Sequence, residues 1–187
     1  MPINTKTGCI EMICGPMFSG KTEELIRRLK RAIIARNKVA VFKPEIDNRY
    51  SDEFVVSHNN NSIKSITINN TKDIVDLSKN INIIGIDEVQ FFNKDIIEIC
   101  IYLANQGKRI IVSGLDKDFK GVPFGIMPNL MCEAEQVTKL TAICNHCGDY
   151  ASFTKRTSDS KDQVLLGETD IYEANCRACF YKKNGDL

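Results

Sequence analysis

The strongest constraint on the fold of this chain is an eight-residue loop that separates two apolar segments. Residues 15–22 read Gly-Pro-Met-Phe-Ser-Gly-Lys-Thr, which fits the pattern G-x-x-x-x-G-K-[ST] in full. The apolar stretch 9–14 before it predicts a buried strand, and the segment after it predicts a helix with Leu25, Ile26, Leu29, Ala32 and Ile33 on one face. A strand that enters a helix through such a loop points backbone N–H groups and the positive helix end at a polyphosphate.

The residue types in the loop suit phosphate binding. Gly15 and Gly20 allow backbone angles and close approaches that a Cβ would prevent. The Lys21 ammonium can reach the β- and γ-phosphates of a nucleotide, and the Thr22 hydroxyl can bind Mg²⁺. The alternative is a glycine-rich turn that matches by chance. We therefore predict a nucleotide phosphate site formed by Gly15, Pro16, Met17, Phe18, Ser19, Gly20, Lys21 and Thr22.

Apolar strand patterns alternate with helical patterns through the first two thirds of the chain. Residues 38–42, 81–86 and 109–114 each predict a buried strand, and a helical pattern runs through Ile96, Ile97, Cys100, Ile101 and Leu103. The polar stretch 45–62 has no steady period and predicts a mobile loop. The alternation indicates an α/β fold, a P-loop (RecA-like) parallel sheet flanked by helices, with ligands at the carboxyl ends of its strands.

Length, charge and hydropathy narrow the class of protein. The chain has 187 residues, 43% of them hydrophobic, and its 25 basic and 24 acidic side chains give a net charge of +1. This balance argues against a dedicated nucleic-acid binder, and no apolar run is long enough to span a membrane. The N-terminal residues lack the apolar stretch of a signal peptide. We expect a cytoplasmic protein without nucleic-acid or membrane partners, with a main domain over residues 1–140 and a small unit over 141–187.

Four of the eight cysteines stand in or near apolar segments. Free cysteine behaves as a small buried hydrophobic residue, so we interpret Cys9, Cys14, Cys100 and Cys132 as part of the core.

The other four cysteines form two C-x-x-C pairs, Cys144 with Cys147 and Cys176 with Cys179, separated by 28 residues. Two such pairs supply four thiolates for a tetrahedral Zn²⁺, and the closed shell leaves no position for chemistry. The alternatives are a redox pair, which needs only one C-x-x-C, and an iron–sulfur cluster, which typically has more closely grouped cysteines. His146, inside the first pair, is interpreted as a bystander. The sequence thus predicts a small, loop-rich, zinc-binding C-terminal domain.

Two acidic residues follow the predicted strand 81–86 directly. In a phosphate-loop protein, an acidic residue at the end of a buried strand typically holds Mg²⁺, and Asp87 is our candidate. Glu88 is then placed to act as a general base toward an attacking hydroxyl, or equally toward water. The pair does not separate a kinase from an ATPase. The alternative interpretation is a helix N-cap for the following segment.

Aromatic residues follow two of the predicted strand ends. Phe91 and Phe92 come after Asp87-Glu88, and Phe119 and Phe124 come after the strand 109–114. These rings can wall a flat apolar pocket or pack in the core, and the pattern leaves both open. No Asn-Lys-x-Asp guanine signature is present, so we do not expect a GTPase.

These pieces, in this order, resemble the zinc-containing, usually tetrameric family of cytosolic-type thymidine kinases over nearly the whole chain. The resemblance rests on the loop 15–22, Lys43-Pro44 with 47–50, the run 87–92, Gly114-Leu115-Asp116 with Phe119 and 123–125, 139–142, and Thr154-Lys155-Arg156. It implies transfer of the γ-phosphoryl group of ATP to the 5′-hydroxyl of thymidine, giving thymidine monophosphate. It also implies a homotetramer and feedback inhibition by thymidine triphosphate.

The resemblance further implies roles for individual residues. Glu88 would be the base, and the zinc-anchored segment of about residues 152–175 would close over the nucleoside, with the backbone of 165–167 bonding the base. The ATP and Mg²⁺ site would comprise the loop 15–22 with Asp87, Glu88, Val89, Gln90 and Arg156, the last adding positive charge near the phosphates. Thymidine would contact Met17, Phe91, Leu115, Phe119, Phe124, Thr154, Gln163, Leu165, Leu166, Gly167 and Tyr172.

One alternative belongs to a different class: a P-loop ATPase whose zinc module binds nucleic acid. Such a module should carry an excess of Lys and Arg interleaved with exposed aromatic residues. Residues 141–187 do contain basic residues, but seven acidic residues offset them. This composition favours the kinase.

Overall fold

The computed structural model describes residues 7–45, 54–56, 61–158 and 171–182. At its centre is a six-stranded sheet with the order β5-β2-β6-β7-β1-β8, in which every neighbouring pair is parallel. The strands are β1 (Cys9–Gly15), β2 (Val39–Pro44), β5 (Ile66–Ile68), β6 (Ile83–Ile86), β7 (Arg109–Leu115) and β8 (Gln136–Lys139). The predicted α/β fold with a parallel sheet is confirmed.

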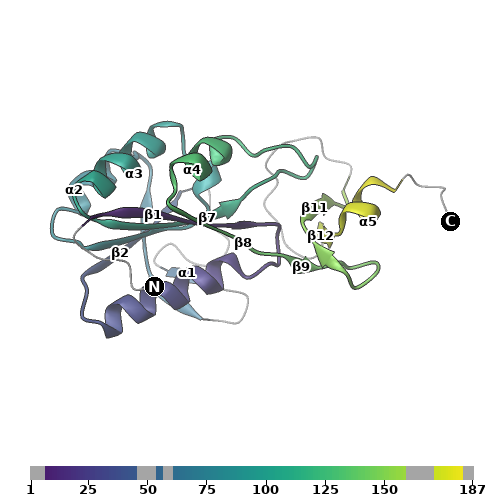
Figure 1. The fold of residues 1–187 in the computed structure, drawn as a ribbon, viewed down its shortest axis with the longest axis horizontal. Helices are drawn as coiled ribbons and strands as arrows, with labels where there is room; N and C mark the ends of the chain where they lie inside the picture. The colour runs from purple at the N-terminus through teal and green to yellow at the C-terminus, as the bar shows by residue number, and fades with distance from the viewer. Residues whose placement is uncertain (1–6, 46–53, 57–60, 159–170, 183–187) are drawn as a thin grey trace.

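Helices cover both faces of this sheet (Figure 1). On one side lies α1 (Lys21–Ile34), and on the other lie α2 (Asp73–Leu77), α3 (Asp95–Asn105) and α4 (Met127–Glu133). Successive strand side chains point to opposite faces, so a strand covered on both sides is apolar throughout. In β1, Ile13 packs in one apolar cluster with Leu25 of α1, and Met12 packs in the other with Ile96 of α3.

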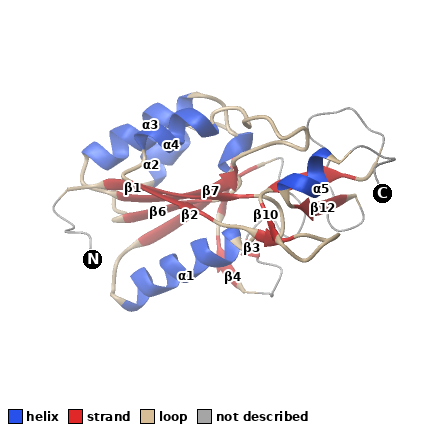
Figure 2. Cartoon of the chain, turned by 45° about the vertical axis from the view of Figure 1, so that its right-hand side comes forward, coloured by secondary structure: helices blue, strands red, loops and turns tan. Residues whose placement is uncertain are grey.

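A short antiparallel pair, β3 (Phe54–Val56) and β4 (Ser62–Lys64), lies beside α1 (Figure 2). The prediction of a mobile loop over 45–62 is therefore wrong for residues 54–56. Val55 is buried in the same apolar cluster as Leu25 of α1, and this contact is invisible in a polar stretch without a period. The edge strands β5 and β8 are also absent from the sequence prediction, because β5 is three residues long and β8 is largely exposed.

Two expectations about buried residues are wrong. Ile33 is 48% exposed: it lies on the same face as Leu29 but in the last turn of α1, beyond the last buried residue, Ala32. Cys132 is exposed in the last turn of α4, whereas Cys9, Cys14 and Cys100 are buried as expected. Complete burial raises the pKa of the Cys100 thiol to about 12, which keeps it a neutral apolar residue.

A small unit lies beyond the carboxyl edge of the sheet, at the right of Figure 1. It consists of the antiparallel pairs β9 (Ala142–Ile143) with β10 (Tyr150–Ala151) and β11 (Phe153–Arg156) with β12 (Tyr172–Asn175), followed by α5 (Arg177–Tyr181). As predicted, this part has no long helix among its described residues. Nowhere in the described parts of the chain is a helix long and apolar enough to cross a membrane.

Candidate active site

The loop 15–22 joins β1 to α1 at the carboxyl edge of the sheet. Gly15 and Gly20 both have positive φ values, 150° and 81°. A Cβ on Gly15 would lie 2.4 Å from the carbonyl oxygen of Leu140, so only glycine fits there. Lys21 Nζ and Ser19 Oγ each donate to the Pro16 carbonyl oxygen at 2.8 Å. The loop therefore curls back on itself at the N-terminus of α1, the position at which backbone N–H groups bind anions.

Asp87 follows β6 and lies beside the end of this loop. Thr22 Oγ1 donates to Asp87 Oδ2 at 3.1 Å, and the Ser113 hydroxyl of β7 donates to the other carboxylate oxygen. Asp87 is only 4% exposed. A hydroxyl and a carboxylate held together at the phosphate site are the oxygen ligands that Mg²⁺ prefers. The residues present therefore fit this ion.

Glu88 has an unusual backbone conformation, with a φ of 50°. Residues other than glycine rarely adopt such angles, and those that do often lie at functional sites. Its Oε2 accepts a hydrogen bond from Gln90 Nε2 at 2.5 Å, and Gln90 Oε1 accepts one from the Leu115 N–H at 3.0 Å. Glu88 precedes the short 3-10 helix η1 (Val89–Phe91), but its side chain makes no capping hydrogen bond. The N-cap alternative therefore does not describe this residue.

Two of the predicted pocket aromatics meet behind the acidic pair. The rings of Phe91 and Phe124 pack edge to face with centroids 5.8 Å apart. Phe124 is buried in the core cluster on the α3 side, and the half-buried Phe91 and Leu115 pack against that cluster. The core interpretation therefore applies to these residues, and a pocket walled by their rings stays a prediction.

Arg156 lies among residues that were predicted to contact thymidine. It faces Tyr172 across the β11–β12 pair and donates from Nη2 to the Tyr172 hydroxyl at 2.7 Å. Its guanidinium carbon lies 3.8 Å from the centroid of the Phe119 ring. The structure thus brings Arg156, Phe119 and Tyr172 together from the small unit and the loop after β7. Stacking of this kind favours a fixed guanidinium orientation.

Thr154 connects the small unit to the phosphate loop. Its Oγ1 accepts a hydrogen bond from the Met17 N–H at 2.9 Å, so two predicted substrate residues from distant parts of the sequence are adjacent. The remaining predicted residues of this group, Gln163, Leu165, Leu166 and Gly167, lie outside the described residues.

The four cysteines of the two C-x-x-C pairs come together in the small unit. Their sulfur atoms all lie within 4.8 Å of one another, and Cys147 Sγ is 3.6 Å from Cys176 Sγ. Sulfurs around a tetrahedral Zn²⁺ are about 3.8 Å apart, given Zn–S bonds of about 2.3 Å. The donor set therefore fits a closed four-sulfur metal site. His146 bonds instead to Glu173, at 2.9 Å, as expected of a bystander.

The surroundings of Cys144 favour the thiolate form of its side chain. Burial by itself would raise the pKa of this group, but backbone N–H groups of Cys176 and Cys147 donate toward the sulfur and lower its pKa to about 6. Hydrogen bonds among the thiols raise the pKa of Cys147 and Cys179 at the same time, so Cys144 is the thiol that loses its proton more readily, and only deprotonated cysteine binds metal.

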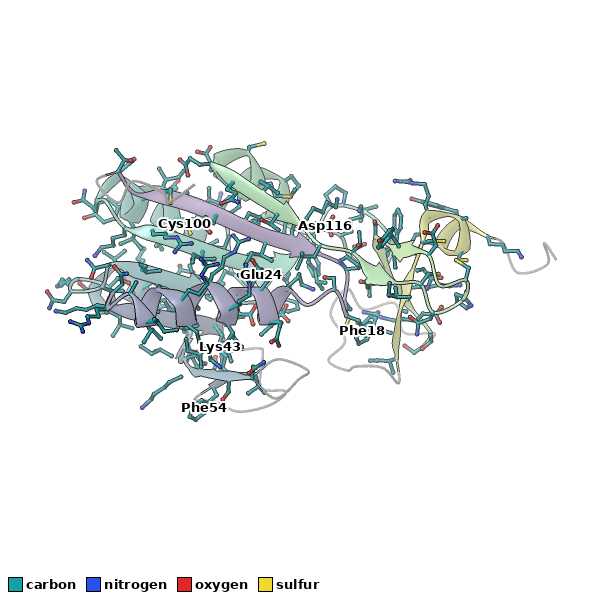
Figure 3. All side chains as sticks on the ribbon, turned by 60° about the horizontal axis from the view of Figure 1, so that its bottom comes forward. Phe18, Glu24, Lys43, Phe54, Cys100 and Asp116 are labelled. Carbon is teal, nitrogen blue, oxygen red and sulfur yellow. The ribbon has the colours of Figure 1, made fainter. Side chains whose placement is uncertain are left out.

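A charge cluster around the buried Asp116, at the ends of β7 and β8, was not predicted from residue patterns. Asp116 accepts from Lys139 Nζ at 2.6 Å and from Lys117 Nζ at 3.3 Å. Burial opposes ionisation of Asp116, but the hydrogen bond from Lys139 and the charge of Lys117 hold its pKa below the ordinary value. Figure 3 shows Asp116 at the edge of the sheet that faces the small unit.

The fold and the site together define the class. A parallel sheet, a glycine-rich loop with Lys21 and Thr22 at a helix N-terminus, and an acidic pair after β6 are the features of a P-loop nucleotide-binding protein. The solved structure of the flagellar accessory protein FlaH from Methanocaldococcus jannaschii is similar in fold. It has a TM-score of 0.52 and 14% identity, covering 78% of this chain and 76% of that one.

Comparison of the sequence then gives the family. Residues 8–180 match the family model described as thymidine kinase. The thymidine kinase of Bacteroides thetaiotaomicron is 54% identical over 181 residues, 97% of this chain and 91% of that one. Those of Bacteroides fragilis strain YCH46 and of Rhodothermus sp. are 55% and 51% identical, covering 95% and 92% of this chain and 89% and 81% of theirs. The chain belongs to the thymidine kinase family, and its reaction is the phosphorylation of thymidine.

Proposed function

We propose that this kinase transfers the γ-phosphoryl group of ATP to the 5′-hydroxyl of thymidine, with Glu88 as the general base. The observation that carries the proposal is the grouping of Thr22, Asp87 and Glu88 at the end of β6, beside the phosphate loop. Phosphoryl transfer depends mainly on positioning and on neutralising charge. An anion site, two metal-binding oxygens and a carboxylate base at one sheet edge supply these requirements.

On the ATP side, the loop 15–22 would bind the phosphates through its backbone N–H groups. Lys21, which donates to Pro16 in the structure, would turn its ammonium toward the β- and γ-phosphates. Thr22 and Asp87 would hold Mg²⁺, which supplies positive charge to the phosphates when bound. Val89 and Gln90 would complete this side, Val89 as part of the buried core and Gln90 by the hydrogen bond that orients Glu88.

On the nucleoside side, Glu88 would accept the proton of the thymidine 5′-hydroxyl as the hydroxyl oxygen attacks the γ-phosphorus. The bond between the γ-phosphorus and the β–γ bridging oxygen would break, and ADP would leave. Thymidine would lie among Met17, Phe91, Leu115, Phe119, Phe124, Thr154 and Tyr172, with Gln163, Leu165, Leu166 and Gly167 covering it. Arg156, stacked on Phe119 and bonded to Tyr172, would bring positive charge to the phosphates from this side. A segment that closes over the pocket keeps water from accepting the phosphoryl group.

Cys144, Cys147, Cys176 and Cys179 would hold one Zn²⁺ per chain. A four-sulfur shell has no open position, so the ion would have a structural role. It would anchor both ends of the segment 152–175, whose ordering each time thymidine binds would otherwise cost conformational entropy.

The remaining proposals concern the protein in the cell. The resemblance supports a homotetramer and feedback inhibition by thymidine triphosphate. All eight cysteines are free in the structure, which suits the reducing cytoplasm.

A division into units 1–140 and 141–187 is supported by the end of β8 at Lys139 and the start of β9 at Ala142.

The test is phosphoryl transfer from γ-labelled ATP to thymidine by the wild type and by Glu88→Gln. Glutamine keeps the shape and the hydrogen bond to Gln90 but cannot accept a proton, so kcat should fall on the order of 10²–10⁴-fold. Thymidine binding, measured by calorimetry, should change little. A Gln variant with nearly full kcat would show that Glu88 is not the base. Failure of the wild type to label thymidine would reject the proposed reaction.

A further inference from the structure

Phe18 belongs to the phosphate loop, but its side chain packs in the small unit. It contacts the apolar cluster that is formed by Ala142, Cys144, Ala151, Ala174 and Cys176, against which Cys179 also packs. Figure 3 shows Phe18 between the start of α1 and the strands of the small unit. Three of the four cysteines that fit a metal site therefore share a cluster with a residue of the loop predicted to bind ATP.

The backbone of Phe18 is held in a conformation that a large side chain rarely adopts. Its φ is 63°, in the left-handed region that favours glycine. Such a conformation persists only where the surroundings determine it. The packing of the ring in the small unit is one contact that can do so, since it fixes the direction in which the side chain leaves the loop.

The neighbouring residue is held from the same side. The Met17 N–H donates to Thr154 Oγ1 at 2.9 Å, and Thr154 is 4% exposed on β11. Just before the loop, the Leu140 N–H donates to the Cys14 carbonyl oxygen at 2.7 Å, a bond that extends the β1–β8 pairing of the central sheet. Consecutive residues of the phosphate loop are thus fixed by segments more than 120 residues away in the sequence.

We propose that the four-cysteine unit is a structural support of the phosphate loop, with Phe18 and Thr154 as the positioning residues that transmit this support. The unit would serve ATP binding as well as the closure over thymidine. The inference rests on the proposed role of residues 15–22 as the ATP phosphate site. Because coupling between two sites is reciprocal, binding of ATP should also stabilise the small unit.

The first test distinguishes the effect of the Phe18 ring on ATP binding from the effect of its backbone angle. We would measure the Kd for MgATP by calorimetry, without thymidine, for the wild type, Phe18→Ala, Phe18→Leu and Phe18→Gly. Loss of the apolar anchor should raise the Kd about tenfold in the Ala and Gly variants, a typical coupling factor. Leu, which can fill the same cluster, should stay within about threefold of the wild type.

Two outcomes would overturn the inference. If Phe18→Ala binds ATP as the wild type does while its circular dichroism is native, the ring does not position the loop. If Phe18→Gly binds ATP as well as the wild type, only the positive φ matters and the small unit gives no support. Failure of the wild type itself to bind ATP would instead reject the phosphate-site role, so the two failures are distinguishable.

The second test uses the hydrogen bond between Thr154 and Met17. Thr154→Val keeps the shape and removes the acceptor, whereas Thr154→Ser keeps the hydroxyl. Val should raise the Kd for ATP in the absence of thymidine, and Ser should restore it. Since Thr154 is also a proposed thymidine contact, an effect of Val on thymidine alone, with ATP binding unchanged, would contradict the positioning role.

The third test links the cysteines to the loop through Phe18. Removal of metal with a zinc-selective chelator, in excess Mg²⁺, should raise the Kd for ATP of the wild type. The same treatment should change the Kd of Phe18→Ala much less, because that variant is already uncoupled. Equal effects on both proteins would show that the small unit does not act through Phe18. Hydrogen exchange in residues 142–156 should slow on addition of ATP to the wild type, and an unchanged rate would argue against reciprocity.

Discussion

The phosphate half and the nucleoside half of the proposed active site are held in place by different means. The phosphate half rests on β1 and β6, where Met12, Ile13 and Ile86 are fully buried between helices on both faces. The nucleoside half rests on two-stranded pairs, stacked rings such as Phe153 on Phe180, and the cysteine cluster. Small units bury too little apolar surface to be stable alone and commonly need a metal. The first half is therefore stabilised by the general core, and the second by a few specific groups.

The largest effect should come from a change in the phosphate half. Lys21→Ala removes the cation that would neutralise the transferring phosphoryl group, so kcat/KM for ATP should fall on the order of 10³-fold. Thymidine binding should be unchanged, because the small unit and the aromatic pocket are intact. Calorimetry with each ligand and steady-state kinetics check this. Lys30→Ala, an exposed lysine on the same helix, is the matched control, and a similar loss in that variant would contradict the assignment.

A change in the nucleoside half should loosen the small unit and weaken thymidine binding, while the central sheet stays folded. Cys176→Ser should reduce bound zinc well below one per chain, make the segment 152–175 sensitive to proteases and raise the thymidine KM about tenfold or more. The sheet should remain folded, because its strands lie outside the cysteine unit. ATP binding should weaken as well if Phe18 couples the two halves. Cys132→Ser, at an exposed position, should leave metal content and kinetics unchanged, and full zinc in Cys176→Ser would disprove the metal site.

The two halves also differ in what the sequence could predict. Strand β1, the loop and α1 are contiguous, so motif and period are sufficient to place Lys21, Thr22 and the buried face of the helix. Asp87 and Glu88 follow a buried strand directly, and parallel strands align their carboxyl ends, so their convergence on the loop was also predictable. The four cysteines were predicted as a cluster because their spacing is specific.

Contacts between distant segments could not be predicted in this way. The seating of Phe18 in the small unit and the bond from Met17 to Thr154 depend on tertiary packing, for which the sequence has no local signal. The same holds for Arg156, whose stacking on Phe119 involves residues from two different units. Short or exposed strands such as β5 and β8 were missed because periodicity needs length and burial.

A smaller effect should distinguish pocket from core within the nucleoside half. Phe119→Ala removes a ring that is half-buried and stacked on Arg156. The thymidine KM should rise about tenfold, since stacking of a base on an aromatic ring contributes about 1–3 kcal/mol. The ATP KM should change little, and steady-state kinetics with each substrate varied in turn measure both. Tyr150→Ala, at a ring of the small unit that is 73% exposed, is the control. Equal rises in both KM values, with a lower Tm, would mean that Phe119 is only part of the core.

The smallest effect should come from a charge that belongs to neither half. Glu24 on α1 accepts hydrogen bonds from Arg27 at 2.6 Å and from Arg28 at 2.8 Å. These bonds lower the pKa of Glu24 from 4.5 to about 2, and the bond from Arg27 has the larger effect. A carboxylate with a depressed pKa in the folded state adds stability above its unfolded pKa, and this contribution disappears as the pH falls from about 4.5 toward 2. At pH 7, Glu24→Gln should therefore have a free energy of unfolding, measured in urea, that is about 1 kcal/mol lower than that of the wild type, after allowance for the exposed Arg27 partner.

The difference in unfolding free energy between the wild type and Glu24→Gln should shrink as the pH falls below 4.5, because only the wild-type side chain can take up a proton there. Both KM values should stay within about twofold of the wild type at pH 7, since the charges around Glu24 stabilise the helix and not a bound phosphate. If this difference in unfolding free energy stayed constant down to pH 3, glutamine would destabilise the protein through altered packing and not through the loss of a charge. A selective rise in the ATP KM would place Glu24 in the phosphate half, and the boundary between that half and the general core would have to be drawn one turn further along α1.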